Sequence, residues 1–232
     1  MGGLTQWLAQ LRLDSIWQTL VVVLASLFCI TVHETCHGLA AYWMGDDTAK
    51  RMGRLTLNPL KHVDLVGLIM MALVHFGWAK PVPINMRRFR NPKAGMALTA
   101  LAGPISNVLL ALVALLLRSV VILVAMGTAH YGTLISYLIL FFEYMAVLSA
   151  GLAVFNLFPI PPLDGSKVLF ALLPDSSYDK LMRYEKYGML LLVVLLFFNV
   201  LDTPLIFLRE KLLDGLSWIL TPVVRGLTKL LL

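Results

Sequence analysis

The chain has 232 residues, of which 59% are hydrophobic and 14% are charged, and its mean hydropathy is +0.83. Soluble domains average about 45–50% apolar and about 25% charged residues, so this composition excludes an ordinary soluble domain and indicates an integral membrane protein. The net charge of +6 comes from basic residues lying between apolar stretches, as membrane orientation signals do. No basic face with interleaved aromatic residues is evident, so nucleic acid is not an expected partner.

The N-terminal part is predicted to hold one spanning helix and an irregular connection. A span is expected at about 15–44, after a short stretch at 4–13 with helical apolar spacing. Cys29 and Cys36 both fall in this span and indicate no disulfide framework. The start has no basic region followed by a small-residue cleavage site, so we expect no cleaved signal peptide.

Residues 46–93 differ in character from the span before them. They contain nine lysines and arginines and four prolines, with an apolar segment at 63–77 in their middle. A spanning helix needs roughly 20 residues, and this segment is shorter. We therefore expect it to be re-entrant or interfacial, and partly β.

Two strong helices are predicted at 96–126 and 134–158, and Gly103-Pro104 is expected to kink the first of them. Shorter apolar segments at 187–201 and 205–220 follow a polar stretch at 175–186. The predicted fold is all-α and polytopic, with five or six transmembrane helices and the re-entrant or partly β segment after the first. The basic 46–93 region is expected in the cytoplasm, and the loop at 127–133, which has no lysine or arginine, on the other side.

Residues 33–37 read His-Glu-Thr-Cys-His, which is an HExxH motif. Residues four apart share one face of a helix, so His33 and His37 can bind the same metal ion. Glu34 is rotated by about 100° from His33, where it can reach a metal-bound water without being a ligand. Zinc lowers the pKa of such a water to about 7, and Glu34 can then act as the general base. Ionisable groups inside a span are usually functional, which favours a catalytic site over coincidence.

Hydrolytic zinc sites usually have three protein ligands, and the residues alone leave the third one open. The remaining candidates are Cys36, His62, Asp64, His75, His130, Glu143 and Asp164. The predicted topology places Asp164 on the same side as the end of the helix that carries HExxH, and His130 on the opposite side. Asp164 follows a proline-rich run that ends the preceding helix, although Asp-Gly after prolines is also typical of a plain turn.

With these motifs in order, the sequence resembles the site-2 proteases, which are polytopic intramembrane zinc metalloproteases. The resemblance covers roughly residues 20–175 and rests on HETCHG at 33–38, LAGPISN at 101–107 and NLFPIPPLDG at 156–165. The segments GRLTLNPLKHVD at 53–64 and GWAKPVPIN at 77–85 look like the compact bacterial branch, without PDZ or CBS domains. The chain is then one membrane-embedded domain, 1–232, with a catalytic core at about 15–175 and C-terminal helices at about 187–220.

The resemblance implies that Asp164 is the third zinc ligand beside His33 and His37, with one Zn²⁺ per chain. It also implies that Asn156 lies in the active site, where its amide can polarise the scissile carbonyl or hold the substrate strand. A helix-end cap or an interhelical hydrogen bond explains Asn156 equally well. The roles of His62, Asp64 and Asn107 stay open, and a structural role is favoured for Gly103 and Pro104.

We therefore predict a zinc metalloendopeptidase that hydrolyses peptide bonds in or near transmembrane segments, with Glu34 activating a zinc-bound water. The expected partners are transmembrane protein substrates and the lipid bilayer. The expected location is the bacterial cell membrane, as a multi-pass protein with the active site toward the cytoplasmic side. The alternatives are a membrane transporter or a metal-binding scaffold without proteolytic activity. Glu34 discriminates between them, because a carrier has no obvious need for a carboxylate beside His33 that is not a ligand.

Overall fold

The computed structural model describes residues 16–64, 67, 79–129, 132–174 and 187–232. Within these ranges, three helices are long and apolar enough to cross a membrane: α2 (Ile16–Trp43), α5 (Pro92–Thr128) and α6 (Thr133–Leu157). A fourth candidate span is a bent pair, the helix Tyr187–Phe197 followed by α9 (Asp202–Leu231), whose axes differ by 88°. The prediction of a helical integral membrane protein is thus confirmed. The number of spans, expected to be five or six, is three or four in the described part of the chain.

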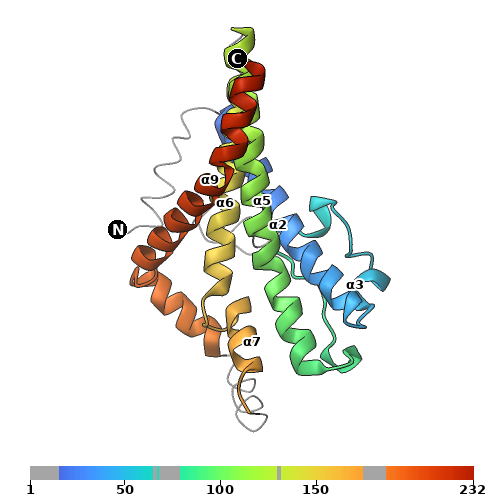
Figure 1. The fold of residues 1–232 in the computed structure, drawn as a ribbon. Coiled ribbons are helices and arrows are strands. Elements are labelled where there is room, and N and C mark those ends of the chain that lie inside the picture. The colour runs from blue at the N-terminus through green and yellow to red at the C-terminus, as the bar shows by residue number, and fades with distance from the viewer. Residues whose placement is uncertain (1–15, 65–66, 68–78, 130–131, 175–186) are drawn as a thin grey trace.

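The three spans form a bundle in which each contacts the other two, and Figure 1 shows them side by side. Small side chains line their common interface, including Ala25 and Cys29 of α2, Ala114 of α5 and Ala146 of α6. Lipid chains are as apolar as leucine, so helices in a membrane associate through close packing of this kind rather than through hydrophobic burial. The bundle therefore provides a fixed frame for polar groups placed inside it.

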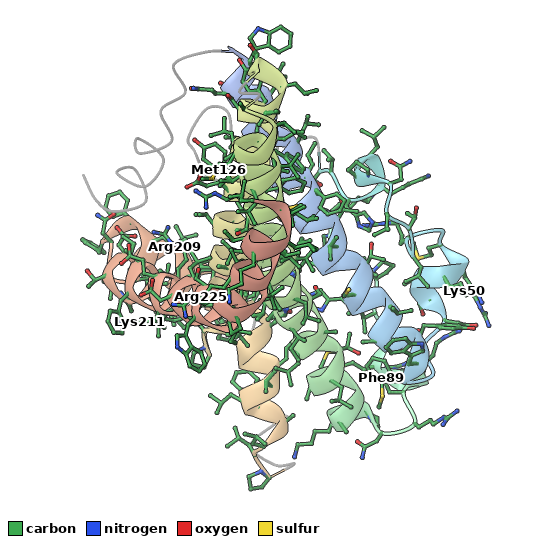
Figure 2. The ribbon with its side chains drawn as sticks, turned by 45° about the horizontal axis from the view of Figure 1, so that its top comes forward. Lys50, Phe89, Met126, Arg209, Lys211 and Arg225 are labelled. Carbon is green, nitrogen blue, oxygen red and sulfur yellow. The ribbon has the colours of Figure 1, made fainter. Side chains whose placement is uncertain are left out.

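The C-terminal helix α9 packs on the same bundle, through a cluster of Ala111, Ala150 and Leu216. Figure 2 shows Arg209, Lys211 and Arg225 along this helix. Charged groups are costly inside a membrane, so α9 is a candidate span only as part of the bent pair that it forms with the helix before it.

The beginning of α5 is fixed by a cap and by an aromatic contact. The side chain of Asn91 accepts a hydrogen bond from Ala94 N at 3.1 Å, and Pro92 takes the first helical position. A Cβ added to Gly95 would lie 2.6 Å from the ring of Phe89, so only glycine lets this ring lie against the first turn. Phe89 is labelled in Figure 2 near this end of α5. The helix then continues through Pro104 without a break.

The connection between α2 and α5 is compact and contains α3 (Thr48–Arg51) and the short 3-10 helices η1 (Pro59–Lys61) and η2 (Met86–Arg88). The buried carboxylate of Asp46 accepts hydrogen bonds from Thr48 N at 3.0 Å and from Asn85 N at 2.6 Å. An isolated antiparallel bridge joins Val63 to Ala79. This bridge is the only β pairing among the described residues of the connection, and most of the predicted re-entrant segment at 63–77 lies outside them.

After α6 the chain turns back, and α7 (Asp164–Ala171) begins with Asp164. A Cβ on Gly165 would lie 2.2 Å from Leu157 O, so the turn can be this tight only with glycine at that position. The helix Tyr187–Phe197 covers the turn through a cluster of Leu163, Leu192 and Leu201. The C-terminal helices thereby hold in place the loop that carries Asp164.

Candidate metal centre

The two histidines of the HExxH motif lie one turn apart on α2 and face the interior of the bundle. Each is 6% exposed, and their Nε2 atoms are 2.9 Å apart. The rings meet edge to face, with centroids separated by 4.5 Å. The prediction that His33 and His37 share a helix face is confirmed by this geometry.

The structure brings Asp164 to the same point. Its Oδ2 atom lies 3.3 Å from His33 Nε2 and 3.1 Å from His37 Nε2, and the residue is 8% exposed. Zinc bonds to nitrogen and oxygen measure about 2.0–2.2 Å, so tetrahedral ligand atoms lie about 3.3–3.6 Å from one another. The observed separations of 2.9 to 3.3 Å are close to that value. Two imidazoles and a carboxylate are also ligands that zinc prefers, so these residues fit a zinc ion.

The carboxyl of Asp164 is held in the anionic form that a metal ligand must have. Burial by itself raises its pKa, but hydrogen bonds to His33 and His37 and the charges of these rings have the opposite effect, and the net pKa lies below the usual range. A lowered pKa keeps the group ionised over the whole neutral range.

One face of α5 supports both histidines. His37 Nδ1 lies 2.7 Å from Thr99 O, and His33 Nδ1 lies 3.1 Å from Nδ2 of Asn107. Between them, a Cβ added to Gly103 would lie 2.4 Å from His37 Nε2 and 2.6 Å from His33 Cε1. The imidazole rings therefore lie directly on the backbone of Gly103, which gives the LAGPISN motif a specific task beside the metal centre.

The general base predicted from the sequence is also positioned by a neighbouring segment. Glu34 is half-buried, and its Oε2 atom accepts a hydrogen bond from Val82 N at 2.9 Å. Arg54, which is buried, donates from Nη2 to Lys80 O at 2.7 Å and to Pro81 O at 3.2 Å. Arg54 thus holds the strand-like segment that orients Glu34. Sequence reasoning missed it, because nothing distinguishes Arg54 from the other basic residues of the connection.

Asn156 lies near the end of α6 and is half-buried. Its Nδ2 donates to Leu152 O, one turn earlier in the same helix, at 3.0 Å. This bond lies within α6 and reaches none of its last four carbonyls, so it is neither a helix-end cap nor an interhelical bond, and the role of Asn156 in the active site stays a prediction.

The other candidates for the third ligand have different partners. His62 Nε2 bonds to Thr56 O at 2.8 Å within the connection, and Thr35 of α2 donates from Oγ1 to the same carbonyl at 2.8 Å. His62 therefore braces the part of the connection that Thr35 joins to α2. Asp64 closes a local turn by accepting from Gly67 N. Glu143 pairs with Arg118, and Cys36 is a half-buried free thiol. His75 and His130 lie outside the described residues.

Loss of a residue that only hydrogen-bonds to a metal ligand typically weakens metal binding by roughly 10–100-fold. If Asp164 is itself the third ligand, Asp164→Asn should weaken zinc binding by more than that. The amide removes the negative charge while keeping the shape of the side chain. Zinc affinity can be measured by competition with a chelator on the purified protein. Asp214→Asn, at an exposed position of α9, is the control and should leave the affinity unchanged. Equal affinities of the two variants would contradict the assignment of Asp164.

Comparison of the sequence with known proteins identifies the family of this chain. Residues 20–199 match the model of Peptidase family M50. The chain belongs to Peptidase family M50. This confirms the resemblance to the site-2 proteases, and together with the convergent ligand set it supports a zinc metalloprotease.

The names of several relatives of this M50 member agree with the assignment to the zinc metalloproteases. YwhC of Bacillus subtilis, named as a candidate zinc metalloprotease, is 40% identical over 174 residues, which are 75% of this chain and 78% of that protein. Rip2 of Mycolicibacterium smegmatis and Rip2 of Mycobacterium tuberculosis carry the same description. They are 28% and 27% identical over 202 residues, which are 84% of this chain and 74% of each of those proteins. No solved structure matches the chain significantly.

Proposed function

We propose that this M50 member is an intramembrane protease that hydrolyses peptide bonds in or near the transmembrane segments of other membrane proteins. The observation that carries the proposal is the position of the ligand set. His33 and His37 are buried within a candidate span, and Asp164 reaches them from the turn that follows another. A protease built in this way receives its substrates through the membrane.

Bound to His33, His37 and Asp164, a zinc ion would supply a Lewis acid for the scissile carbonyl and lower the pKa of water. Glu34 is the base that takes the proton from the attacking water and later passes it to the leaving amine. Its hydrogen bond to Val82 N engages one carboxylate oxygen and fixes the direction in which the side chain points.

A substrate helix must unwind before it can react, because its amides are hydrogen-bonded within the helix. The segment of Lys80 to Val82 lies beside Glu34, and its N–H groups already donate to His62 O and to Glu34 Oε2, so an unwound strand that pairs with it would donate to its carbonyls. The many basic residues of the connection between α2 and α5 support a metal centre toward the cytoplasmic side of a cell membrane, and this location would give water a short route to the site.

The test uses the purified chain in lipid vesicles with peptides that contain a transmembrane segment and a quenched fluorophore pair. We expect cleavage of these peptides, loss of cleavage with a zinc chelator, and recovery when zinc is added back. A soluble peptide of the same length and without an apolar segment is the matched control for membrane delivery. Zinc uptake into the vesicles without cleavage of any peptide would contradict the proposal and favour a transporter. Membrane proteomics of cells that carry Glu34→Ala should then show uncleaved natural substrates.

A further inference from the structure

Asn107 is fully buried inside the bundle and has a polar atom without a partner. It lies on α5 one turn after Gly103 and two turns after Thr99, so the same helix face presents all three to α2. Its Nδ2 atom is 3.1 Å from His33 Nδ1. Its Oδ1 atom is buried without a hydrogen-bond partner among the described residues. A buried polar atom in this condition is rare and calls for a physical explanation.

The proton on His33 supplies that explanation. Nε2 of His33 points to the other two ligand atoms, at 2.9 Å from His37 Nε2 and 3.3 Å from Asp164 Oδ2. An imidazole that binds a metal through Nε2 keeps its proton on Nδ1, and this N–H needs an acceptor. For His37 the acceptor is the carbonyl of Thr99, at 2.7 Å. For His33 the group at the corresponding place is the amide of Asn107.

An NH₂ group cannot accept this proton, but the amide oxygen can. The oxygen and nitrogen of an amide occupy equivalent places, so a rotation of 180° exchanges them and leaves the rest of the side chain where it is. We propose that Asn107 is a positioning residue that accepts a hydrogen bond from His33 Nδ1–H through Oδ1 and thereby fixes the ring and the tautomer that binds zinc. The inference rests on the metal centre of the proposed function and does not depend on which peptide is cut.

The orientation of both histidines then comes from α5, by two different means. The main-chain carbonyl of Thr99 holds His37, and no substitution can remove it directly. The side chain of Asn107 holds His33 and is open to mutation. Groups that accept a hydrogen bond from a ligating histidine also make its metal-binding nitrogen more basic. Their loss typically lowers metal affinity by about 10–100-fold.

The test measures zinc affinity by chelator competition on the purified protein, without any substrate. We expect Asn107→Leu, which removes the acceptor at similar volume, to weaken zinc binding by about 10–100-fold. Asn107→Asp keeps an oxygen at the same place and should bind zinc within a few-fold of the wild type, roughly. Should Asn107→Leu not fold, Asn107→Ala removes the acceptor without placing a larger apolar group beside His33.

The matched control is Ser149→Ala. Ser149 is also fully buried and also bonds across helices, donating from Oγ to Cys29 Sγ at 3.1 Å, yet it belongs to α6 and faces no ligand. If Asn107 served only to join two helices, Asn107→Leu and Ser149→Ala would lower thermal stability and leave zinc affinity unchanged, which would overturn the inference. Equal loss of zinc in Asn107→Asp and Asn107→Leu would overturn it as well. A wild-type protein that binds zinc but cuts no peptide would count against the proposed function alone.

Discussion

Replacing Glu34 by glutamine should lower the rate of peptide cleavage by about 10²–10⁴-fold, the usual contribution of general acid–base catalysis. The amide keeps the size of the side chain and can still accept the hydrogen bond from Val82 N, which measures 2.9 Å in the structure. It cannot take a proton from water at neutral pH. Because Glu34 is not one of the three clustered ligands, the variant should retain its zinc.

Two measurements on the same preparation check this expectation: the initial rate of cleavage in vesicles, and the zinc content by metal analysis. Glu210→Gln is the control, since Glu210 is exposed on α9 and pairs with its neighbour Arg209. Cleavage at the wild-type rate by Glu34→Gln would show that another group acts as the base. Loss of zinc together with activity would instead make Glu34 part of the binding site.

Gly103→Ala is expected to disable the metal centre although Gly103 has no functional group. The new methyl carbon would lie 2.4 Å from His37 Nε2 and 2.5 Å from His37 Cε1, where ordinary contacts begin at 3.4 Å. The rings or α5 must therefore move by about 1 Å, and a misplacement of that size can cost about 10²-fold in rate. We expect a matching decline in zinc affinity, measured by chelator competition.

The control for Gly103→Ala is Gly151→Ala, at a glycine in the C-terminal half of α6. A Cβ at Gly151 would meet only Arg209 Cδ, at 3.9 Å, which is ordinary van der Waals contact. Both variants add one methyl group to a transmembrane helix, so they differ mainly in the presence of the histidine rings. Full zinc binding and activity in Gly103→Ala would mean that α5 is free to move away from α2.

The sequence predicted the three spans well because their apolar runs end at clear signals. The expected ranges 15–44 and 134–158 compare with Ile16–Trp43 and Thr133–Leu157. The second span was placed at 96–126, but α5 begins at Pro92, because Asn91 and Pro92 start the helix while Lys93 still looks like part of a loop.

The C-terminal part was predicted less well, for two physical reasons. The helix Tyr187–Phe197 ends in a turn where Asn199 adopts a left-handed conformation with φ of 56°, and asparagine tolerates this region better than most residues. After the turn, α9 extends to Leu231 rather than to 220. Its later turns carry Arg225 and Lys229, and these charges interrupt the apolar pattern from which the helix was predicted.

For the site, the sequence predicted the histidine pair and the proposed base Glu34, since their geometry is local to one helix. The approach of Asp164 depends on the packing of α6 and α7. The predicted topology put Asp164 on the side of the histidines, and the family resemblance singled it out among the candidates. Gly103 contacts both histidine rings, and Arg54 donates a hydrogen bond to the segment beside Glu34. Both contacts join parts of the chain that are distant in sequence. Neither leaves a pattern in the linear order of residues.

The split of the ligand set between α2 and the turn after α6 has a consequence for biosynthesis. The ribosome delivers the chain from its N-terminus, so His33 and His37 reach the membrane well before Asp164 is translated. The metal centre is complete only when α6 has been inserted and the following turn has folded back against α2. A nascent or truncated chain that stops before this turn has the base and two ligands but lacks the third. Any activity that needs all three residues can therefore begin only after α6 and the following turn have been synthesised.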